Sequence, residues 1–517
     1  MPARPAGILP RRMGLGGGHP PRGWGRRRAK MRDLDVAIIG AGAAGLSVAA
    51  MAAGLGRKVT VFERAPADHR RPADAAIMVK ALLAAAHRMQ GLRQGRDLGI
   101  VAEGVTVNWP RLRHHLAATA AGSAGRSALQ ELAGHGEGHG EGQEAGHGIE
   151  VIGARAFFTG PDRIQAGDRS YRFRRAVIAA GCEPLLPDLP GLVNAPWCTP
   201  DGLAELPALP MHLLVLGGTP MGLEAAQAFA RLGSRVSLIE ASPNLLAQED
   251  AELRLPLREA LRRDGVELHE NTRVLAAERT GAGIALLTAE GARIEGSHLL
   301  IALGETPRLA PLDLAAGGIA ASERGIATGR DLRSRSNRRV WAAGNVADPE
   351  GLGPRRFTRL AARHAEVIAR SMLFRRRAVL DYARLPLRLD TTPQLVRVGL
   401  TAQQARERHR EVEVLRQDFS GLDATLAGGT VTGEVQLVLG PGRTLLGAAA
   451  VGDGVGELGA LFTLALERGV RLHELATLDL PWPSLAEAVR LAADKPYAGQ
   501  RFSPILRQLA SWLGRLP

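Results

Sequence analysis

The chain has 517 residues, of which 45% are hydrophobic and 23% charged, a composition typical of a globular protein with about three domains. Its two cysteines, Cys182 and Cys198, are too few for a disulfide framework, so we expect a cytoplasmic protein. No stretch approaches the ~18 uncharged apolar residues of a membrane-spanning helix. Composition therefore argues against a disulfide-stapled secreted domain and against a membrane span.

The net charge of +14 is concentrated at the N-terminus. Residues 1–32 contain nine lysines and arginines and no acid, which leaves only +5 for the remaining 485 residues. The segment has neither the apolar core of a signal peptide nor the serines of a transit peptide. We expect a disordered basic tail and no nucleic-acid-binding domain, and translation could begin at Met31. The alternative is a tail that contacts nucleic acid or anionic lipid.

The first chemical signature is VAIIGAGAAGLSVAAMAAGLGRKVTVFER, residues 36–64. A strand enters a turn that carries Gly40, Gly42 and Gly45, an apolar helix follows, and a second strand ends at Glu63. In a dinucleotide-binding unit the first glycine makes the tight turn, the second admits a pyrophosphate, and the third lets helix and strand pack closely. The pyrophosphate lies at the positive end of the helix. Glu63, 23 positions after Gly40, is placed to bind a ribose.

Residues 75–90 are rich in alanine and leucine and are predicted to form a helix. Residues 133–148, AGHGEGHGEGQEAGHG, cannot hold a helix because glycine recurs at almost every second position, so we expect a flexible surface loop. Its histidines and glutamates could bind a metal, but nothing fixes their geometry, and no metal site is predicted. These residues are His135, Glu137, His139, Glu141 and His147.

A second unit of the same kind follows the Pro-rich stretch LLPDLPGLVNAPWCTP, which marks a boundary near residue 205. HLLVLGGTPMGLEAAQAFARLGSRVSLIEA again gives strand, turn, helix and strand, with Glu240 23 positions after Gly217. Two such units indicate two nucleotide-binding domains. Thr219 replaces the second glycine and is expected to crowd the pyrophosphate and weaken binding. Because Glu240 would repel a 2′-phosphate, NAD is favoured over NADP.

Later motifs complete the pattern and carry a resemblance. The chain resembles the FAD-dependent pyridine nucleotide-disulfide oxidoreductases, the group of dihydrolipoamide dehydrogenase, glutathione reductase and mercuric reductase. The matching stretches, in the family's order, are GAGAAG with Glu63, VIAAGCEP, GGTPMGLE with Glu240, IALGETP, VWAAGNVAD and RTLLGAAAVGDGVGELGALFTLALERG.

The resemblance implies an α/β fold with two Rossmann-like nucleotide-binding domains and a C-terminal α+β dimerisation domain. FAD is implied on the first domain, NAD(P)H, with NADH preferred, on the second, and a homodimer through the third. The expected division is a basic tail (1–32), an FAD-binding domain (33–205 and 310–384), an NAD(P)-binding domain (206–309), a dimerisation domain (385–500) and a C-terminal tail (501–517).

The resemblance also assigns site residues. Lys80 is similar to the family lysine beside flavin N5 and Glu224 to its ion-pair partner, whereas Asn345 stands where the family usually has an aspartate on the ribityl chain. A helix beginning near Phe357 is similar to the one whose N-terminus faces the flavin and would stabilise its reduced anion. The implied FAD residues are Gly40, Gly42, Gly45, Glu63, Lys80, Ala180, Gly181, Gly344, Asn345 and Thr358. The implied NAD residues are Gly217, Gly218, Gly222, Glu224, Glu240, Val274 and Gly304. The alternative for Lys80 and Glu224 is a surface lysine and an exposed helix acid.

The chain departs from the family in its thiol chemistry. Aligned on KALL, the two positions of the family's CxxxxC disulfide hold Arg71 and Ala76. The family's C-terminal His-Pro dipeptide becomes Trp482-Pro483, although the glutamate five residues on remains as Glu487. An indole cannot exchange a proton at neutral pH, so the relay has lost both of its parts. We expect Glu487 to have gained Arg71 or another arginine as its partner.

These departures predict an FAD enzyme that oxidises NADH and passes electrons directly to a non-thiol acceptor such as a quinone, a dye-like aromatic or oxygen. The expected catalytic residues are Lys80, Glu224, Trp482 and Glu487. Trp482 of the second subunit could stack on a flat acceptor or fill the space left by the lost relay, and both interpretations stay open. The alternatives are a catalytically weak FAD-binding scaffold or redox sensor and, third, a disulfide or mercuric reductase with a substituted relay. Cys182 and Cys198 are expected to be packing residues.

Overall fold

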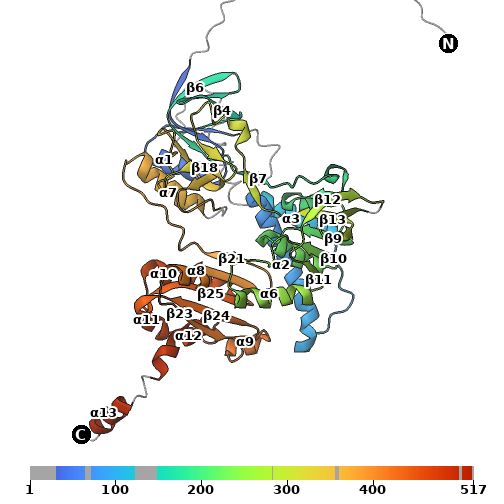
Figure 1. Ribbon diagram of the computed structural model, residues 1–517, viewed down its shortest axis with the longest axis vertical. Helices are drawn as coiled ribbons and strands as arrows, with labels where there is room; N and C mark the ends of the chain where they lie inside the picture. The colour runs from blue at the N-terminus through green and yellow to red at the C-terminus, as the bar shows by residue number, and fades with distance from the viewer. Residues whose placement is uncertain are drawn as a thin grey trace, which may run out of the picture.

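The structure is a computed structural model that describes residues 31–63, 72–122, 148–281, 283–355, 360–499 and 504–514. Its elements form a mixed first sheet and a parallel second sheet, both with flanking helices, and an antiparallel C-terminal sheet, which confirms the predicted α/β class (Figure 1). The first sheet, with α1 (Ala43–Gly54) and α7 (Leu360–Met372), lies at one end of the molecule in Figure 1. The predicted basic tail up to residue 30 and the Gly/His/Glu loop up to residue 147 lie outside the described residues.

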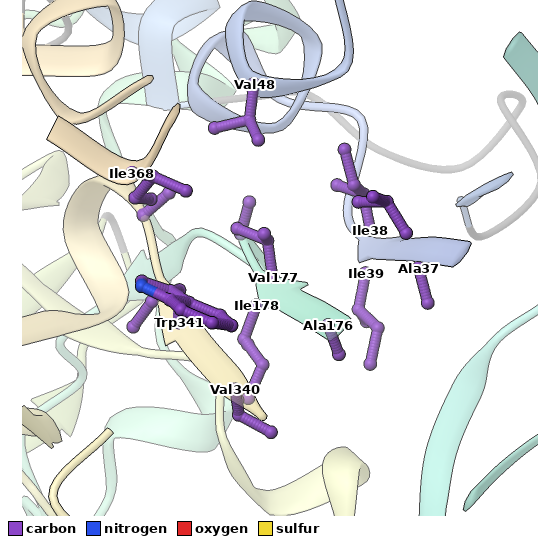
Figure 2. Close-up of a cluster of buried hydrophobic side chains, with 14 of the residues drawn as sticks. Ala37, Ile38, Ile39, Val48, Ala176, Val177, Ile178, Val340, Trp341 and Ile368 are labelled. Atoms are coloured by element: carbon purple, nitrogen blue, oxygen red, sulfur yellow. The ribbon is translucent and has the colours of Figure 1, made fainter. Parts of the chain in front are cut away.

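The first sheet is built around β1 (Arg32–Ile39), which pairs in parallel with β2 (Val59–Phe62) and β6 (Arg169–Ile178). Its other strands are β3 (Ile149–Ile152), β4 (Ala156–Gly160), β5 (Arg163–Ala166) and β19 (Val340–Ala342). Figure 2 shows Ile38 and Val177 on the side of Val48 of α1, while Ile39 and Ile178 point to the opposite side. Both sides are buried, and a parallel sheet covered on both faces therefore reads as the continuous apolar run seen in β1.

The second sheet has the order β11-β10-β9-β15-β8, all parallel. Its strands are β8 (Trp197–Cys198), β9 (His212–Leu216), β10 (Arg235–Ile239), β11 (Val266–His269) and β15 (His298–Ile301). They are accompanied by α5 (Pro220–Leu232), α6 (Ala251–Arg263) and the antiparallel strands β12 (Val274–Arg279), β13 (Ile284–Thr288) and β14 (Arg293–Gly296). The repeat read from the sequence therefore folds as a second strand–helix–strand unit.

The helix expected around residues 75–90 is α2 (Pro72–Gln94), and it packs against α5 of the second unit. With α3 (Trp109–Ala121) it belongs to a core cluster that also contains buried side chains of the second and C-terminal sheets. Trp109 fixes α3 there, because its Nε1 donates to the Leu206 carbonyl at 2.8 Å and its ring lies 5.8 Å from that of Phe229. This packing brings α2 beside both other sheets.

The C-terminal sheet is antiparallel, with the order β21-β22-β25-β24-β23. Its strands are β21 (Leu387–Leu389), β22 (Gln394–Gly399), β23 (Glu413–Asp418), β24 (Gly433–Leu439) and β25 (Leu445–Gly452). The helices of this region are α8 (Ala402–Arg408), α9 (Asp423–Gly428), α10 (Leu458–Arg468), α11 (Leu472–Ala476), α12 (Glu487–Ala498) and α13 (Pro504–Leu513). The predicted C-terminal tail thus contains a helix. Within the described ranges, no helix is both long and apolar enough to cross a membrane.

Small sheets connect these units. Strand β7 (Cys182–Pro184) pairs with β16 (Glu305–Pro307), and β18 (Gly325–Thr328) pairs with β17 (Ala321–Ser322) and β20 (Ala347–Pro349). The short 3-10 turn η6 (Gly344–Val346) follows β19. The stretches between the first and second sheets therefore run through β7 and β16.

Candidate active site

The first glycine turn can be built only with glycine at two of its three positions. Gly40 has φ +105°, and a Cβ there would lie 2.3 Å from the Ala179 carbonyl oxygen. A Cβ on Gly45 would lie 1.9 Å from the carbonyl oxygen of Gly40. Gly42 differs, because a Cβ there meets nothing within 4 Å. Gly42 is also the N-cap of α1 and makes no side-chain cap, so this open space at a helix N-terminus fits a pyrophosphate.

The acid at the end of β2 closes this turn. Oε2 of Glu63 accepts a hydrogen bond from the Ala41 backbone N–H at 2.5 Å. The second unit repeats the arrangement, since Oε2 of Glu240 accepts from the Gly218 N–H at 2.6 Å. The sequence predicted that each acid would bind a ribose. The structure adds that each acid anchors the glycine turn of its own unit.

The second turn has the same close packing. Gly217 has φ +111°, and a Cβ there would lie 2.5 Å from the Ala302 carbonyl oxygen. A Cβ on Gly222 would lie 2.2 Å from the Gly217 carbonyl oxygen, and one on Gly218 would lie 2.6 Å from Cδ2 of Leu245. Gly217 and Gly222 therefore require glycine, because backbone atoms stand in the way of a Cβ, whereas at Gly218 only the movable ends of the Leu245 and Glu240 side chains do.

Glu240 stays ionised at this turn. Burial would raise the pKa of Glu240, but hydrogen bonds from Ser242 and Gly218 outweigh burial and lower the pKa below its usual range. One of these bonds joins Oε1 of Glu240 to the Ser242 N–H at 2.7 Å. A fixed negative charge at this position is what the sequence analysis used to favour NAD over NADP.

Thr219 has a different role from the one expected. Its Oγ1 donates to the Ala302 carbonyl at 2.7 Å and accepts from the Gly222 N–H at 3.3 Å, so it is the N-cap of α5. The hydroxyl therefore occupies one of the donors that a bound phosphate would use. The sequence analysis predicted weak nucleotide binding from crowding, and this occupied donor is a second reason for the same prediction.

We predict that Thr219→Gly lowers the KM for NADH by about two- to tenfold, the worth of one hydrogen bond of ~0.5–1.5 kcal/mol. The helix should lose only a few tenths of a kcal/mol, because glycine is itself a tolerable N-cap. Steady-state kinetics measure this effect. Thr219→Ser is the matched control, because it keeps the cap and removes only the methyl group. An unchanged or raised KM in Thr219→Gly would contradict the prediction, and a fall in both variants would restore crowding as the cause.

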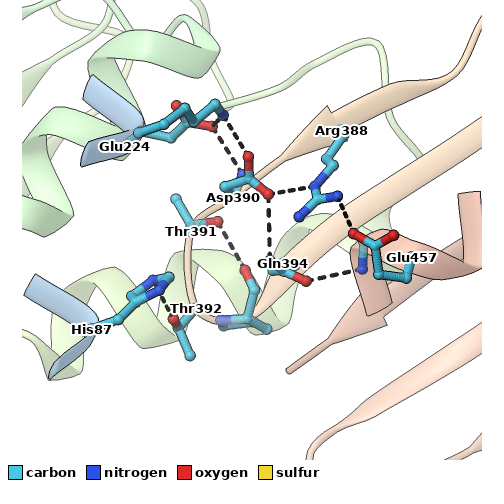
Figure 3. Close-up of polar contacts among 11 residues, drawn as sticks. His87, Glu224, Arg388, Asp390, Thr391, Thr392, Gln394 and Glu457 are labelled. Atoms are coloured by element: carbon cyan, nitrogen blue, oxygen red, sulfur yellow. Dashed lines mark hydrogen bonds and ion pairs between the residues drawn. The ribbon is translucent and has the colours of Figure 1, made fainter. Parts of the chain in front are cut away.

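Lys80 and Glu224, 144 residues apart in sequence, form an ion pair between α2 and α5. Nζ of Lys80 lies 2.5 Å from Oε1 of Glu224 and 2.7 Å from Oδ2 of Asp390, which follows β21. The Asp390 N–H also donates to Glu224 Oε1 at 2.8 Å, so three segments meet at one ammonium group (Figure 3). The surface lysine and exposed acid that stood as the alternative do not describe this pair, since Glu224 is 1% exposed.

The two carboxyls of this cluster differ electrostatically. Burial raises the pKa of Glu224, and Lys80 opposes that rise only in part. For Asp390 burial acts in the same direction, but Lys80 and Arg388 outweigh it and lower the pKa. Arg388 lies 2.5 Å from Asp390 and 2.7 Å from Glu457. Asp390 is therefore the carboxyl beside Lys80 that stays ionised, and the sequence analysis did not identify it.

A polar network supports the other side of the cluster. Thr392 lies in the segment between β21 and β22, and its Oγ1 is 2.9 Å from Nε2 of His87, two turns beyond Lys80 on α2 (Figure 3). The Thr392 N–H donates to Gln227 of α5 at 2.7 Å. Arg231, also on α5, donates to the same threonine hydroxyl at 3.0 Å. These bonds tie α2 and α5 to the C-terminal sheet and fix the direction of Lys80.

The η6 turn holds two more predicted FAD residues. Gly344 has φ +71°, and a Cβ there would lie 2.9 Å from Cβ of Ala44 in α1. The Asn345 side-chain Nδ2 donates to Oε2 of Glu305 at 3.0 Å. The backbone carbonyl oxygen of Asn345 lies 3.5 Å from Sγ of Cys182. The turn is thus packed between α1 and the β7–β16 pair.

His364 is a buried residue at this turn that the sequence analysis missed. Its Nδ1 accepts from the Gly344 N–H at 2.9 Å, and its Nε2 lies 2.9 Å from the Tyr382 hydroxyl. Burial lowers the pKa of His364 to about 4, so the ring is neutral and its Nε2–H donates to Tyr382. The histidine is thus a fixed support for the turn, and no local motif marks it.

The other implied residues frame the two nucleotide turns. Ala180 and Gly181 follow β6, with φ +73° at Gly181. Gly304 follows β15 with φ +101°, and Val274 begins β12. Thr358, together with the expected helix start near Phe357, lies outside the described residues. Their roles in nucleotide binding stay predictions.

Trp482 lies on the surface of the single chain, 80% exposed, and its Nε1 donates to Asp423 of α9 at 2.8 Å. Glu487 pairs with Arg490 one helical turn further on, so the arginine partner expected for it is present. That pairing lowers the pKa of Glu487. Arg71, the other candidate, lies outside the described residues. The hydrogen bond to Asp423 holds the N–H edge of the indole in place, while the ring remains exposed to solvent.

Neither cysteine belongs to α2, the helix that carries Ala76, the one described position of the family disulfide. Cys182 is buried in β7, and Cys198 lies in β8, where burial raises its pKa to about 12. A thiol with such a pKa remains protonated and unreactive at neutral pH. Among the residues that the structure describes, no group of three or more His, Cys, Asp or Glu side chains could hold a metal ion.

Two nucleotide-binding units followed by an antiparallel domain define a class of two-nucleotide flavoprotein oxidoreductases. The chain belongs to the pyridine nucleotide-disulphide oxidoreductase family, because residues 34–367 match that family and residues 387–493 match its dimerisation domain. It is therefore an FAD-dependent pyridine nucleotide oxidoreductase by family, and its dimerisation domain suggests a homodimer.

Similar proteins have different names within this family. A mercuric reductase of Streptomyces lividans is 32% identical over 471 residues, which cover 89% of this chain and 95% of that protein. A dihydrolipoyl dehydrogenase of Thermus scotoductus is 30% identical over 472 residues, covering 90% and 97%. The HOCl-induced flavoprotein disulfide reductase RclA from Escherichia coli has a similar fold, with a TM-score of 0.76, 22% identity and 89% and 99% coverage.

Proposed function

We propose that this protein oxidises NADH through FAD and passes the electrons directly to a non-thiol acceptor such as a quinone. The observation that carries the proposal is the combination of two nucleotide-binding turns, the second with Thr219 in place of one glycine, with the absence of cysteine from α2. The whole chain has two cysteines, at positions 182 and 198, and Ala76 stands on α2 where the family disulfide would be. The thiol pair of the family's relay is therefore missing from its usual place in this chain.

The chemistry that bound FAD would supply is hydride acceptance from NADH and transfer of the electrons to an acceptor. The chain's part is to bind and orient. Gly42 leaves room at the N-terminus of α1 for the pyrophosphate, and Glu63 keeps the turn closed. Lys80 forms ion pairs with Glu224 and Asp390, which fix the position of its ammonium group. We assign this group to the edge of the flavin ring. Catalysis by such a site rests on orientation and on charge that is fixed before the reaction.

Trp482 supports an aromatic acceptor. Its indole N–H is held by Asp423, and the exposed ring offers a flat apolar face in the region that matches the dimerisation domain. Offset stacking of a quinone on such a face contributes about 0.5–1.5 kcal/mol beyond burial. The alternative, a tryptophan that only fills space between subunits, predicts that Trp482→Leu leaves the acceptor KM unchanged.

We predict that one equivalent of NADH, mixed anaerobically with the purified protein, bleaches the flavin absorbance without the long-wavelength band of a thiolate beside a flavin. NADPH should act at least about tenfold less efficiently, because the ionised Glu240 repels its 2′-phosphate. Stopped-flow absorbance measures both effects. Absence of reduction at saturating NADH would favour the catalytically weak scaffold or sensor.

A cysteine-free variant, Cys182→Ala/Cys198→Ala, is the decisive control because it removes every thiol of the chain. Quinone reduction should stay within about twofold of the parent rate. A panel of quinones, oxygen, disulfides and Hg²⁺ then identifies the acceptor class. Turnover of a disulfide or of Hg²⁺ that disappears in the cysteine-free variant would sink the proposal and establish a substituted thiol relay.

A further inference from the structure

The terminal helix α13, PILRQLASWL, lies apart from the rest of the fold. Figure 1 shows it beyond α12, standing away from the C-terminal sheet. Every side chain described in residues 504–514 is exposed. A ten-residue helix is only marginally stable alone in water, so it needs a surface that the described part of this chain does not provide.

One face of α13 is apolar. Leu509 is 48% exposed, Trp512 62% and Leu513 49%, and their spacing of three and four residues places them together along the helix. Leu506 extends this face by one turn and is 47% exposed. A row of leucine and tryptophan side chains is stabilised when it leaves water for an apolar environment, such as the interfacial region of a membrane.

The opposite face and the flanking sequence are basic. Arg507 lies about 160° around the helix from Leu509, and residues 500–517 contain three arginines and no acid. A protein partner that bound the apolar face alone would not require a segment with positive charges and no negative ones. An apolar stripe with tryptophan, opposed by Arg507 and Ser511 and with no acid on the helix, fits the boundary of an anionic lipid surface.

We propose that α13 binds the surface of anionic membranes through the face formed by Leu506, Leu509, Trp512 and Leu513, lying in the plane of the interface without crossing it. Arg507 contacts lipid phosphates and the apolar side chains enter the outer acyl region. A consequence, which rests on the proposed function, is that the physiological acceptor is a quinone dissolved in the lipid.

The test is co-sedimentation of the full-length holoenzyme with vesicles of phosphatidylglycerol and phosphatidylcholine in about equal parts, and with pure phosphatidylcholine. The parent should bind the anionic vesicles and release at high salt. Leu509→Gln/Trp512→Gln should lower the partition coefficient about tenfold or more, because both side chains leave the lipid. Gln508→Ala, outside the apolar face, should bind like the parent.

Two further outcomes separate α13 from its rivals. A deletion of residues 1–30, which removes most of the basic tail, should keep vesicle binding, and its loss would overturn the proposal in favour of the tail. If Leu509→Gln/Trp512→Gln instead turns the dimer into monomers in sedimentation velocity while the parent ignores vesicles, α13 covers the partner subunit and the proposal is wrong. NADH oxidation with a water-soluble quinone should be equal in parent and variant. Its failure in both would count against the proposed function and leave the binding result intact.

Discussion

A Gly42→Ala variant is expected to fold like the parent and to lose its FAD. In the structure φ at Gly42 is −72°, ordinary for any L-residue, and a Cβ there has no neighbour within 4 Å. The added methyl group would instead occupy the space at the N-terminus of α1, where a pyrophosphate has to meet backbone N–H groups. Loss of two charge-assisted hydrogen bonds of ~1.5–3 kcal/mol each weakens FAD binding about 100-fold or more.

The measurements are the flavin-to-protein absorbance ratio after purification, titration of the apoprotein with FAD, and the thermal unfolding midpoint of the apoprotein. Gly54→Ala is the matched control, since its Cβ also meets nothing within 4 Å but lies at the far end of α1. It should retain FAD and be neutral or slightly more stable, by at most ~1 kcal/mol.

Gly40→Ala distinguishes a binding defect from a folding defect. It combines φ +105° with a Cβ 2.3 Å from the Ala179 carbonyl oxygen, so the turn between β1 and α1 cannot form as it is. We expect little folded protein. If Gly42→Ala kept FAD as tightly as Gly54→Ala, the nucleotide would not lie at this turn, and the proposed function would lose its basis.

Glycine spacing made both nucleotide units predictable from the sequence. Each strand–turn–helix needs glycine at fixed positions because carbonyl oxygens of neighbouring segments stand where a Cβ would be, as Ala179 does for Gly40 and Ala302 does for Gly217. That constraint is local and leaves a regular trace in the sequence. The Lys80–Glu224 pair, in contrast, spans 144 positions and could be proposed only from the resemblance to a family.

Other parts of the site left no such trace. Asp390 is joined to Glu224 across 166 positions by the packing of the C-terminal sheet against α5, and an isolated aspartate before Thr-Thr-Pro signals nothing by itself. His364 faces Gly344 because α7 packs on α1. Thr219 was readable, since a threonine before proline is a helix N-terminus signal, yet its position in the fingerprint drew attention to crowding instead of capping.

The helix α13 shows a different limit. Its leucines and tryptophan have helical spacing, but a short segment after the last family motif was read as a tail. Periodicity predicts a helix only when a surface exists to cover the apolar face, and the residues that the structure describes offer none to α13. Whether such a segment is a helix is therefore decided outside the single chain.

Lys80→Met is expected to destabilise the protein by about 2–3 kcal/mol at pH ~8. Removing one partner of a buried ion pair costs about 3–5 kcal/mol, and we lower that figure because the Lys80 side chain is 37% exposed and solvent screens its charge. The variant leaves the Glu224 carboxyl, in a residue that is 1% exposed, without its cation. The Asp390 backbone N–H still donates to Glu224 Oε1 at 2.8 Å, and Arg388 still pairs with the Asp390 carboxyl. Chemical unfolding at a fixed protein concentration measures the loss.

The pH dependence identifies the cause. Burial already raises the pKa of Glu224, and loss of Lys80 raises it further, so the folded variant binds a proton more readily than the unfolded chain. When a carboxyl has a higher pKa in the folded state than in the unfolded chain, the folded protein becomes more stable as the pH falls through the folded-state pKa. The penalty of Lys80→Met should therefore shrink between about pH 8 and about pH 5. Lys80→Met/Glu224→Gln should be more stable than Lys80→Met alone at pH ~8, because the unpaired charge is gone. A penalty that is independent of pH and unrelieved in the double variant would mean that Lys80 acts through the packing of its aliphatic stem, and that Glu224 and Asp390 do not need its charge.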